Sequence, residues 1–304
     1  MFVDRLHLII NLEQPQAYSN LGDSTVIAHS PLGGKTTTEH LVERWLEREI
    51  SMAPGWIFCH QYALTKLDKN EDSVTREVIR LRLPAGATNA DVYRPAARVQ
   101  APLVIVAHGF ARHRRNMSGW GRHLAKRGIV AVVPDLPSMS DHARNGRFLS
   151  ELREYLLGEE AWRKHIDPAR VGLVGFSAGG LASLLSAAYS PSVTVWIGLD
   201  PVDRDGAGMK AAPLIQARAV VLTAEPSSCN AYGNSQGIVS ALPRREHFRI
   251  AGAVHVDAEW PTSWLAELVC GRSTAGRRAE FQARATNALE EAFTLPTLPG
   301  TQDH

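Results

Sequence analysis

The residue best suited to covalent chemistry is a serine at the centre of a short, glycine-flanked motif. Ser177 lies between Gly175 and Gly179 in the pattern G-x-S-x-G, which is typical of a nucleophile elbow, a sharp turn between a strand and a helix. The glycines let the backbone turn tightly, because they carry no Cβ atom that would clash. A hydroxyl presented on such a turn can attack an ester-like carbonyl and form an acyl-enzyme.

The same pattern occurs a second time, around Ser235, so the flanking sequence must distinguish the two. An apolar run at 171–174 precedes Ser177, and small residues typical of a helix follow it at 180–189, as an elbow requires. Ser235 instead follows the polar, turn-rich residues 229–232. We therefore predict that Ser177 is a nucleophile and that Ser235 is not.

A serine nucleophile needs a general base, and after an elbow of this kind the acid comes first and the histidine second. The histidines that follow Ser177 are His247, His255 and His304. His247 begins an expected strand and His304 is the last residue. His255 follows the final expected strand, in a loop that Gly252 makes flexible. We predict that His255 is the base.

The acid that orients this histidine stays open between two positions. Asp200 ends an apolar run at 193–199, and Glu225 follows the next run at 219–223. A buried carboxylate at either place could fix the histidine tautomer and stabilise the imidazolium. The residues themselves favour the two almost equally.

Two backbone N–H groups are predicted to form the oxyanion hole. One belongs to Ala178, directly after the nucleophile, and the other to Phe110, which follows an apolar strand in the sequence His108-Gly-Phe. Removing one such donor typically costs about 2.7–4 kcal/mol of transition-state stabilisation. The basic residues 112–115 come next, and we interpret them as a solvated loop that an anionic substrate could also contact.

Alternating strands and helices must position these residues. Apolar runs typical of strands buried on both faces of a parallel sheet lie at 103–107, 129–133, 171–174, 193–199 and 219–223, with further strands at 78–83 and 248–251. Helices are expected at 120–127, 148–165, 181–189, 264–269 and 279–293, and a turn at 167–170. This order predicts an α/β fold with a doubly wound, mostly parallel sheet. No large cap domain is expected, since the connection from 201 to 218 is short.

The hydrophobic pattern divides the chain into three predicted parts. Residues 1–72 form an N-terminal extension with a helix at 37–50, residues 73–294 form the α/β catalytic domain, and residues 295–304 form a loose tail. The Gly-Gly-Lys-Thr stretch at 33–36 resembles the end of a phosphate-binding loop. It lacks that loop's first glycine, because His29 is in its place, and we interpret it as an ordinary loop.

Composition argues against several classes of protein. The 304 residues include 33 basic and 31 acidic side chains, a balance that predicts no nucleic-acid partner. No apolar run reaches the roughly 18 residues of a membrane span, and charged residues interrupt the first ten positions, unlike a secretory signal. A cytoplasmic location is expected by default. The twelve histidines show no metal-ligand spacing, so neither a metal nor another cofactor is expected.

Three cysteines, Cys59, Cys229 and Cys270, cannot all pair with one another. A Cys229–Cys270 bridge is conceivable, but the sequence alone favours unpaired thiols. The sequence does not specify the oligomeric state.

Four short segments carry a family resemblance. They are His108-Gly-Phe110, Gly175-Phe-Ser-Ala-Gly-Gly180, Leu199-Asp-Pro-Val-Asp203 and His255-Val-Asp257. Together they resemble the chlorophyllase branch of the α/β-hydrolases. The spacing of 23 residues from Ser177 to Asp200 (200 − 177) also resembles the platelet-activating-factor acetylhydrolases, in which the acid follows the strand after the nucleophile helix. Both resemblances imply Asp200 as the acid rather than Glu225.

These features predict an enzyme that hydrolyses carboxylic esters, of the carboxylesterase or lipase kind, through a Ser177–Asp200–His255 triad and an acyl-enzyme. A site without a cap suits large, lipid-like or surface-presented esters. Plant chlorophyllases usually have arginine where this chain has Ala178, which counts against chlorophyll as substrate. The alternatives are a serine peptidase or acyltransferase and, less favoured, a non-catalytic binding protein. A cysteine-nucleophile dienelactone hydrolase is disfavoured because the elbow carries serine.

Overall fold

A computed structural model of the chain describes residues 8–9, 26–27, 74–96 and 100–294. By its internal contacts the chain divides into two compact units, Met1–Lys69 and Asn70–His304. In the first unit the described residues are two short parallel strands, β1 (Leu8–Ile9) and β2 (Val26–Ile27). The helix expected at 37–50, the loop at 33–36, Cys59 and the tail at 295–304 lie outside the described residues.

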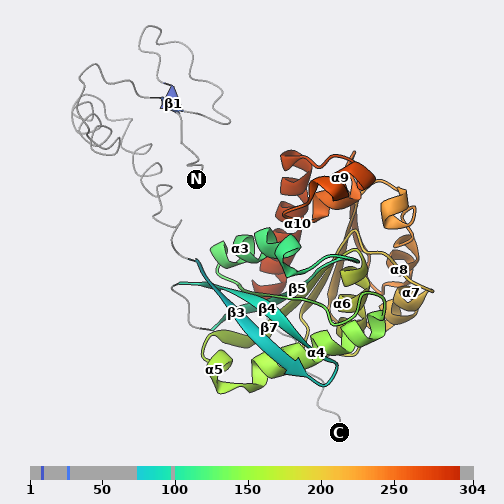
Figure 1. Cartoon of the computed structure of the whole chain (residues 1–304). Helices are drawn as coiled ribbons and strands as arrows, with labels where there is room; N and C mark the ends of the chain where they lie inside the picture. Colours follow the sequence, from blue (N-terminus) through green and yellow to red (C-terminus); the bar gives the residue numbers. More distant parts are fainter. Residues whose placement is uncertain (1–7, 10–25, 28–73, 97–99, 295–304) are drawn as a thin grey trace, which may run out of the picture. The chain divides into compact units, whose positions relative to one another are not determined.

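The second unit is built on an eight-stranded sheet with the order β10-β9-β8-β7-β5-β6-β4-β3 (Figure 1). Its strands are β3 (Val74–Leu83), β4 (Gly86–Pro95), β5 (Ala101–Ala107), β6 (Val130–Pro134), β7 (Ile166–Phe176), β8 (Val195–Leu199), β9 (Arg218–Thr223) and β10 (Glu246–Arg249). The strands from β10 to β6 are parallel to their neighbours. The hairpin β3–β4 joins β6 in antiparallel orientation. The predicted mostly parallel sheet is confirmed.

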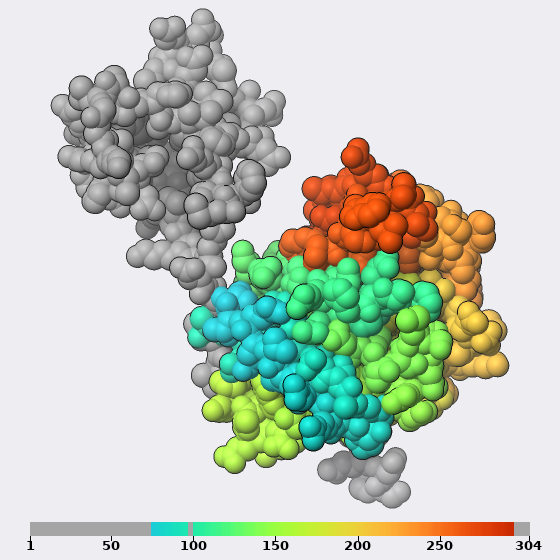
Figure 2. All heavy atoms as spheres, in the orientation of Figure 1, coloured from blue at the N-terminus to red at the C-terminus, as the bar shows by residue number. Residues whose placement is uncertain are grey.

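Helices cover both faces of this sheet. They are η2 (Arg114–Met117), α3 (Ser118–Lys126), α4 (His142–Gly158), α5 (Glu160–Arg163), α6 (Ala178–Ala188), α7 (Ala207–Ala211), η3 (Ala212–Leu214), η4 (Ser228–Asn230), α8 (Gln236–Ala241), η5 (His255–Ala258), α9 (Trp264–Cys270) and α10 (Ala275–Thr294). α3 and α10 lie on one face, and α4 and α6 on the other (Figure 1). In the space-filling view, the C-terminal helices form one end of the second unit (Figure 2).

The central strand β5 shows why this sheet is covered on both faces. All of its residues are buried. Leu103 and Ile105 belong to the core cluster that includes α4 and α6, and Val104 and Val106 belong to the cluster that includes α3 and α10. Since successive strand residues point to opposite faces, a continuous apolar run requires helices on both sides.

Two sequence-based expectations are wrong in detail. The single helix expected at 148–165 is two helices, because α4 begins earlier, where the side chain of Asp141 accepts the N–H of Arg144 (2.8 Å), and ends before an extended Glu159. The turn expected at 167–170 lies within β7, where pairing with β5 changes register. The first turn of α4 is polar, so apolar periodicity alone could not reveal it.

The connection from β8 to β9 contains only the short helices α7 and η3 within the described residues, so no large cap domain is inserted there. No helix in the described part of the chain is long and apolar enough to span a membrane.

A disulfide joins Cys229 in η4 to Cys270 at the end of α9, with the Cα atoms 5.7 Å apart. The interpretation of these cysteines as unpaired thiols was therefore wrong. The two residues are 41 positions apart in sequence, and only the packing of the loops beyond β9 and β10 brings them together. No local pattern in the sequence carries that information.

Candidate active site

Ser177 occupies a strained turn between β7 and α6. Its φ of 54° and ψ of −123° lie in a region that residues other than glycine rarely adopt, at a cost of about 1–3 kcal/mol. The flanking glycines are required by contact, because a Cβ on Gly175 would lie 2.3 Å from the carbonyl oxygen of Gly179. A Cβ on Gly179 would lie 2.3 Å from the carbonyl oxygen of His108. The turn is thus shaped to present one side chain at the carboxyl edge of the sheet.

The structure brings His255 and Asp200 to this serine. The Nε2 atom of His255 lies 2.9 Å from the Oγ atom of Ser177, and its Nδ1 atom lies 2.6 Å from Oδ2 of Asp200. All three side chains are buried. Since a carboxylate only accepts hydrogen bonds, Nδ1 carries the ring proton and donates a hydrogen bond to Asp200. The unprotonated Nε2 then accepts a hydrogen bond from the hydroxyl of Ser177.

Each partner comes from a loop beyond the carboxyl end of a strand. Asp200 follows β8, and His255 begins η5 after β10. The ring of Phe176 lies against the imidazole, with ring centroids 4.7 Å apart. Parallel strands gather such loops at one edge of the sheet, which explains how residues 78 positions apart in sequence meet.

Glu225, the alternative acid, contacts residues other than His255. Its side chain is 45% exposed, and its nearest charged partner is Arg249 at 3.9 Å. Its Oε1 atom accepts the N–H of Gly252 at 3.2 Å. The carboxylate that accepts the hydrogen bond of His255 is that of Asp200.

Ser235 lies in a different environment from Ser177. Its backbone is right-handed helical, with φ −58° and ψ −14°, directly before α8. Gly233 precedes it in a turn rather than at the end of a buried strand. The second G-x-S-x-G pattern therefore begins a short helix and does not form an elbow.

The loop after β5 lies against the nucleophile. A Cβ on Gly109 would be 3.1 Å from the Cβ of Ser177, and both predicted oxyanion residues, Phe110 and Ala178, line one cleft beside it. The buried ring of His108 holds this loop, with Nδ1 2.9 Å from the carbonyl oxygen of Gly109 and Nε2 accepting the N–H of Leu136 at 3.0 Å. Because C=O and N–H point in opposite directions across a trans peptide, the N–H of Phe110 points away from His108.

Burial lowers the pKa of His108, although its hydrogen bond to the backbone of Gly109 opposes this effect. The imidazole is consequently neutral at pH 7, with the proton on Nδ1, since Nε2 is an acceptor.

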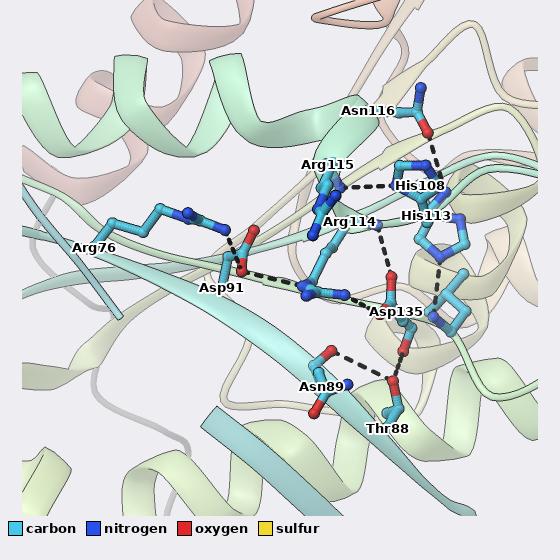
Figure 3. A network of polar contacts seen from close by, with 11 residues as sticks. Arg76, Thr88, Asn89, Asp91, His108, His113, Arg114, Arg115, Asn116 and Asp135 are labelled. Atoms are coloured by element: carbon cyan, nitrogen blue, oxygen red, sulfur yellow. Dashed lines mark hydrogen bonds and ion pairs between the residues drawn. The ribbon is translucent and has the colours of Figure 1, made fainter. Parts of the chain in front are cut away.

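The arginines that follow the oxyanion loop form ion pairs (Figure 3). Arg114 reaches the buried Asp91 at 3.0 Å and Asp135 at 2.5 Å, and its own N–H donates to Asp135 at 2.8 Å. Asp91 also pairs with Arg76, on β3, at 3.0 Å. The interpretation of residues 112–115 as a solvated loop was therefore wrong for Arg114, which ties the loop to β4 and the end of β6.

Arg112 forms a second ion pair, with Glu259 beyond η5. Its Nε atom lies 2.7 Å from Oε1 of Glu259, a carboxylate with no solvent exposure. Burial raises the pKa of Glu259, and the charge of Arg112 opposes that rise. Nearby, the indole N–H of Trp120 donates to the carbonyl oxygen of Ala258 at 2.9 Å. The loop that carries His255 is thus joined to the segment that follows the oxyanion loop.

Two further hydrogen bonds, which no sequence pattern indicated, hold the carboxylate of Asp200. Its Oδ1 atom accepts the N–H of Ala224, and its Oδ2 atom accepts the side-chain N–H of Asn230, both at 3.0 Å. The only available signal for Asn230 was its place in a polar turn after β9, which does not separate it from its neighbours. Within the described residues, no group of three or more His, Cys, Asp or Glu side chains could hold a metal ion.

The fold and this constellation define an α/β-hydrolase of the serine esterase branch. Residues 67–264 match the model of the PET hydrolase-like family, and the chain belongs to that family.

Two individual proteins are informative for comparison. The chain is 27% identical over 199 residues to a bis(hydroxyethyl) terephthalate hydrolase of Streptomyces coelicolor; the match covers 60% of this chain and 63% of that relative. The crystal structure of a dienelactone hydrolase from Anabaena variabilis is similar in fold, with a TM-score of 0.57 and 17% identity, over 72% of this chain and 98% of the other. The second likeness concerns the fold alone.

Proposed function

We propose that this chain is a carboxylic ester hydrolase whose catalytic domain comprises residues 73–294. Ser177 is the nucleophile, His255 the general base and Asp200 the acid. The observation that carries the proposal is the pair of contacts on one imidazole, 2.9 Å to the serine oxygen and 2.6 Å to the carboxylate. Membership of the PET hydrolase-like family supports the same reaction class.

The reaction proceeds in two steps. Oγ of Ser177 attacks the ester carbonyl while Nε2 of His255 takes the hydroxyl proton, and the imidazolium passes this proton to the departing alkoxide. Water then attacks the acyl-enzyme and gives a proton to the same nitrogen; the imidazolium returns this proton to Oγ of Ser177 as the acyl–oxygen bond breaks, which releases the carboxylic acid and regenerates the serine. Asp200 keeps Nδ1 protonated and stabilises the imidazolium in both steps.

The N–H groups of Phe110 and Ala178 form the proposed oxyanion hole. This assignment is supported by the contact of Gly109 with Ser177 and by the orientation that His108 imposes on the Gly109–Phe110 peptide. The proposed mechanism uses no metal or cofactor, since these N–H donors stabilise the negative charge that develops on the oxyanion.

The cleft beside Ser177 supports an aromatic ester as substrate. It has a volume of about 180 Å³, and a cavity of about 150 Å³ is known to take one benzene ring. Phe110 and Met139 line it and are 56% and 64% exposed, so they offer apolar surface to a ring. We propose that diesters of terephthalate type, the substrate in the name of the Streptomyces coelicolor relative, are hydrolysed.

The test is hydrolysis of bis(hydroxyethyl) terephthalate by the purified chain, followed by chromatography of the mono-ester and the released diol. p-Nitrophenyl esters of graded acyl length and a p-nitroanilide are run in parallel. We expect release of the mono-ester, activity on short acyl esters and no cleavage of the amide. Cleavage of the amide would favour the peptidase alternative, and a preference for long acyl chains over the terephthalate would contradict the aromatic assignment.

A further inference from the structure

A buried amide, Asn230 in η4, touches the proposed triad acid. Its side chain is 1% exposed. The Nδ2 atom donates to Oδ2 of Asp200 at 3.0 Å and to the carbonyl oxygen of Glu225 at 2.9 Å. This side chain takes no part in the proton transfers proposed for Ser177 and His255.

The orientation of the amide is fixed by its other end. The Oδ1 atom of Asn230 accepts the N–H groups of Ser227 at 2.8 Å and Gly233 at 3.1 Å. An amide turned over would set its NH₂ group against two N–H donors and its oxygen against a carboxylate. The NH₂ group must therefore face Asp200.

The carboxylate is in turn fixed on both oxygens. Oδ2 accepts from Asn230 and from His255, and Oδ1 accepts the N–H of Ala224. Loss of the Asn230 contact leaves the carboxylate with one hydrogen bond on each oxygen, from His255 to Oδ2 and from Ala224 to Oδ1, so its orientation toward the imidazole is held less tightly. We propose that Asn230 is a positioning residue that holds Asp200 in line with His255. This inference rests on the proposed triad.

The turn that carries Asn230 is covalently anchored. Its neighbour Cys229 is bonded to Cys270, at the end of α9. α9 has little packing of its own, because Ala266 is its only buried residue, and its larger apolar side chains, Trp264, Leu265, Leu268 and Val269, are exposed. The disulfide therefore links η4 and α9 where side-chain packing is sparse, and it limits the movement of Asn230.

The pH dependence of the reaction depends on the charged groups around the imidazole of His255. Besides Asp200, one is Glu259, which is paired with Arg112. The other is Asp257, in the same turn as His255, whose carboxylate lies 2.6 Å from Nε of Arg277. Glu225 contributes only its backbone oxygen to Asn230, and its side chain faces Arg249. Substitutions at position 230 leave all of these groups in place.

The experiment compares three variants by kcat, KM and the pH profile of kcat/KM on a p-nitrophenyl ester. In Asn230→Ala we expect kcat to fall about 10- to 100-fold, the value of a hydrogen bond to a charged group, with KM unchanged. In the isosteric Asn230→Asp, two buried carboxyl groups about 3 Å apart cannot both ionise, so they share one proton; part of the negative charge then leaves Asp200, and the acid limb moves to lower pH. Asn234→Ala is the matched control, because Asn234 makes two side-chain bonds to the backbone of Asp203 in the same loop; it should leave kcat unchanged.

The inference is overturned if Asn230→Ala keeps the kcat of the control, or if its whole effect is on KM. It is also overturned if the acid limb of Asn230→Asp stays in place. If Asn230→Ala does not fold, the pH profile of the isosteric variant decides alone. Ser177→Ala separates this inference from the proposed function: an active Ser177→Ala variant defeats the triad itself, whereas an inactive one with normal Asn230 variants defeats only the role of Asn230.

A double variant, Cys229→Ser with Cys270→Ser, tests the anchor. We expect kcat to fall by less than in Asn230→Ala, again with KM unchanged. The hydrogen bond from Asn230 to Asp200 is still formed in this variant, but the position of Asn230 is less restricted. An unchanged kcat would show that the disulfide is not needed to hold Asn230 in place.

Discussion

The chain contains the same five-residue pattern twice, and the two copies have different structures. Ser177 follows the buried strand β7, has a positive φ and contacts an imidazole. Ser235 follows a turn, has ordinary helical angles and begins the six-residue helix α8. What separates them is the element that precedes each: only a strand ending at the carboxyl edge of the sheet places a hydroxyl where loops from other strands can reach it.

The largest expected difference between the two copies is in catalysis. Ser177→Ala should lower kcat by about 10⁶-fold, as expected when a nucleophile is removed, while Ser235→Ala should leave it unchanged. A fluorophosphonate probe should add its mass to the peptide that contains Ser177 and not to the one that contains Ser235. Labelling of Ser235, or activity in Ser177→Ala, would reverse the assignment.

The comparison extends to the two candidate acids. Asp200→Asn should lower kcat by about 10⁴-fold with little change in fold, because the asparagine no longer fixes the histidine tautomer. Glu225→Gln should be nearly silent, since that side chain is half exposed and faces Arg249. Rates from initial velocities at saturating ester decide between them, and the opposite ranking would make Glu225 the acid.

Alanine substitution of a glycine that flanks each serine should change the free energy of unfolding in opposite directions. Gly179→Ala places a methyl group 2.3 Å from the carbonyl oxygen of His108, and we expect it to destabilise the fold by about 1–3 kcal/mol. Gly237→Ala meets only ordinary contacts, at 3.6 Å from the sulfur of Met209, and lies in α8, so it should stabilise by up to about 1 kcal/mol. Urea unfolding curves give both values. Equal effects would mean that the two motifs are under the same steric constraint.

The smallest expected difference concerns how stability depends on pH. The elbow depends on a buried histidine, His108, whereas the segment 229–242 around Ser235 has none. Because burial depresses the pKa of His108 in the folded protein below the ordinary 6.5, its neutral form contributes stability that is fully present above pH 6.5. That contribution is lost as the pH falls toward the depressed value. In His108→Gln the decline of Tm below pH 6.5 should be shallower than in the wild type. A parallel decline would show that other groups cause it.

The sequence predicted the sheet well because five of its strands are continuous apolar runs, which require burial on both faces. It missed β4, whose first half has no apolar residue larger than alanine, and the first turn of α4, which is mostly polar. Within the site, Ser177 and His255 could be proposed from motif and order along the chain, whereas Asp200 needed a family resemblance. Their catalytic roles stay predictions. Asn230, Glu259 and the disulfide had no local signal, because each depends on which loops meet beyond the ends of the strands.

The bond between Cys229 and Cys270 also bears on where the protein can keep its full structure. Glutathione and thioredoxin keep most cytosolic thiols reduced, while periplasmic and extracellular surroundings preserve cystine. The bond therefore favours an oxidising compartment over the cytoplasm expected by default. Material produced in a reducing host would carry two additional alkylatable sulfurs, and would be an incomplete reference for the properties of the native enzyme.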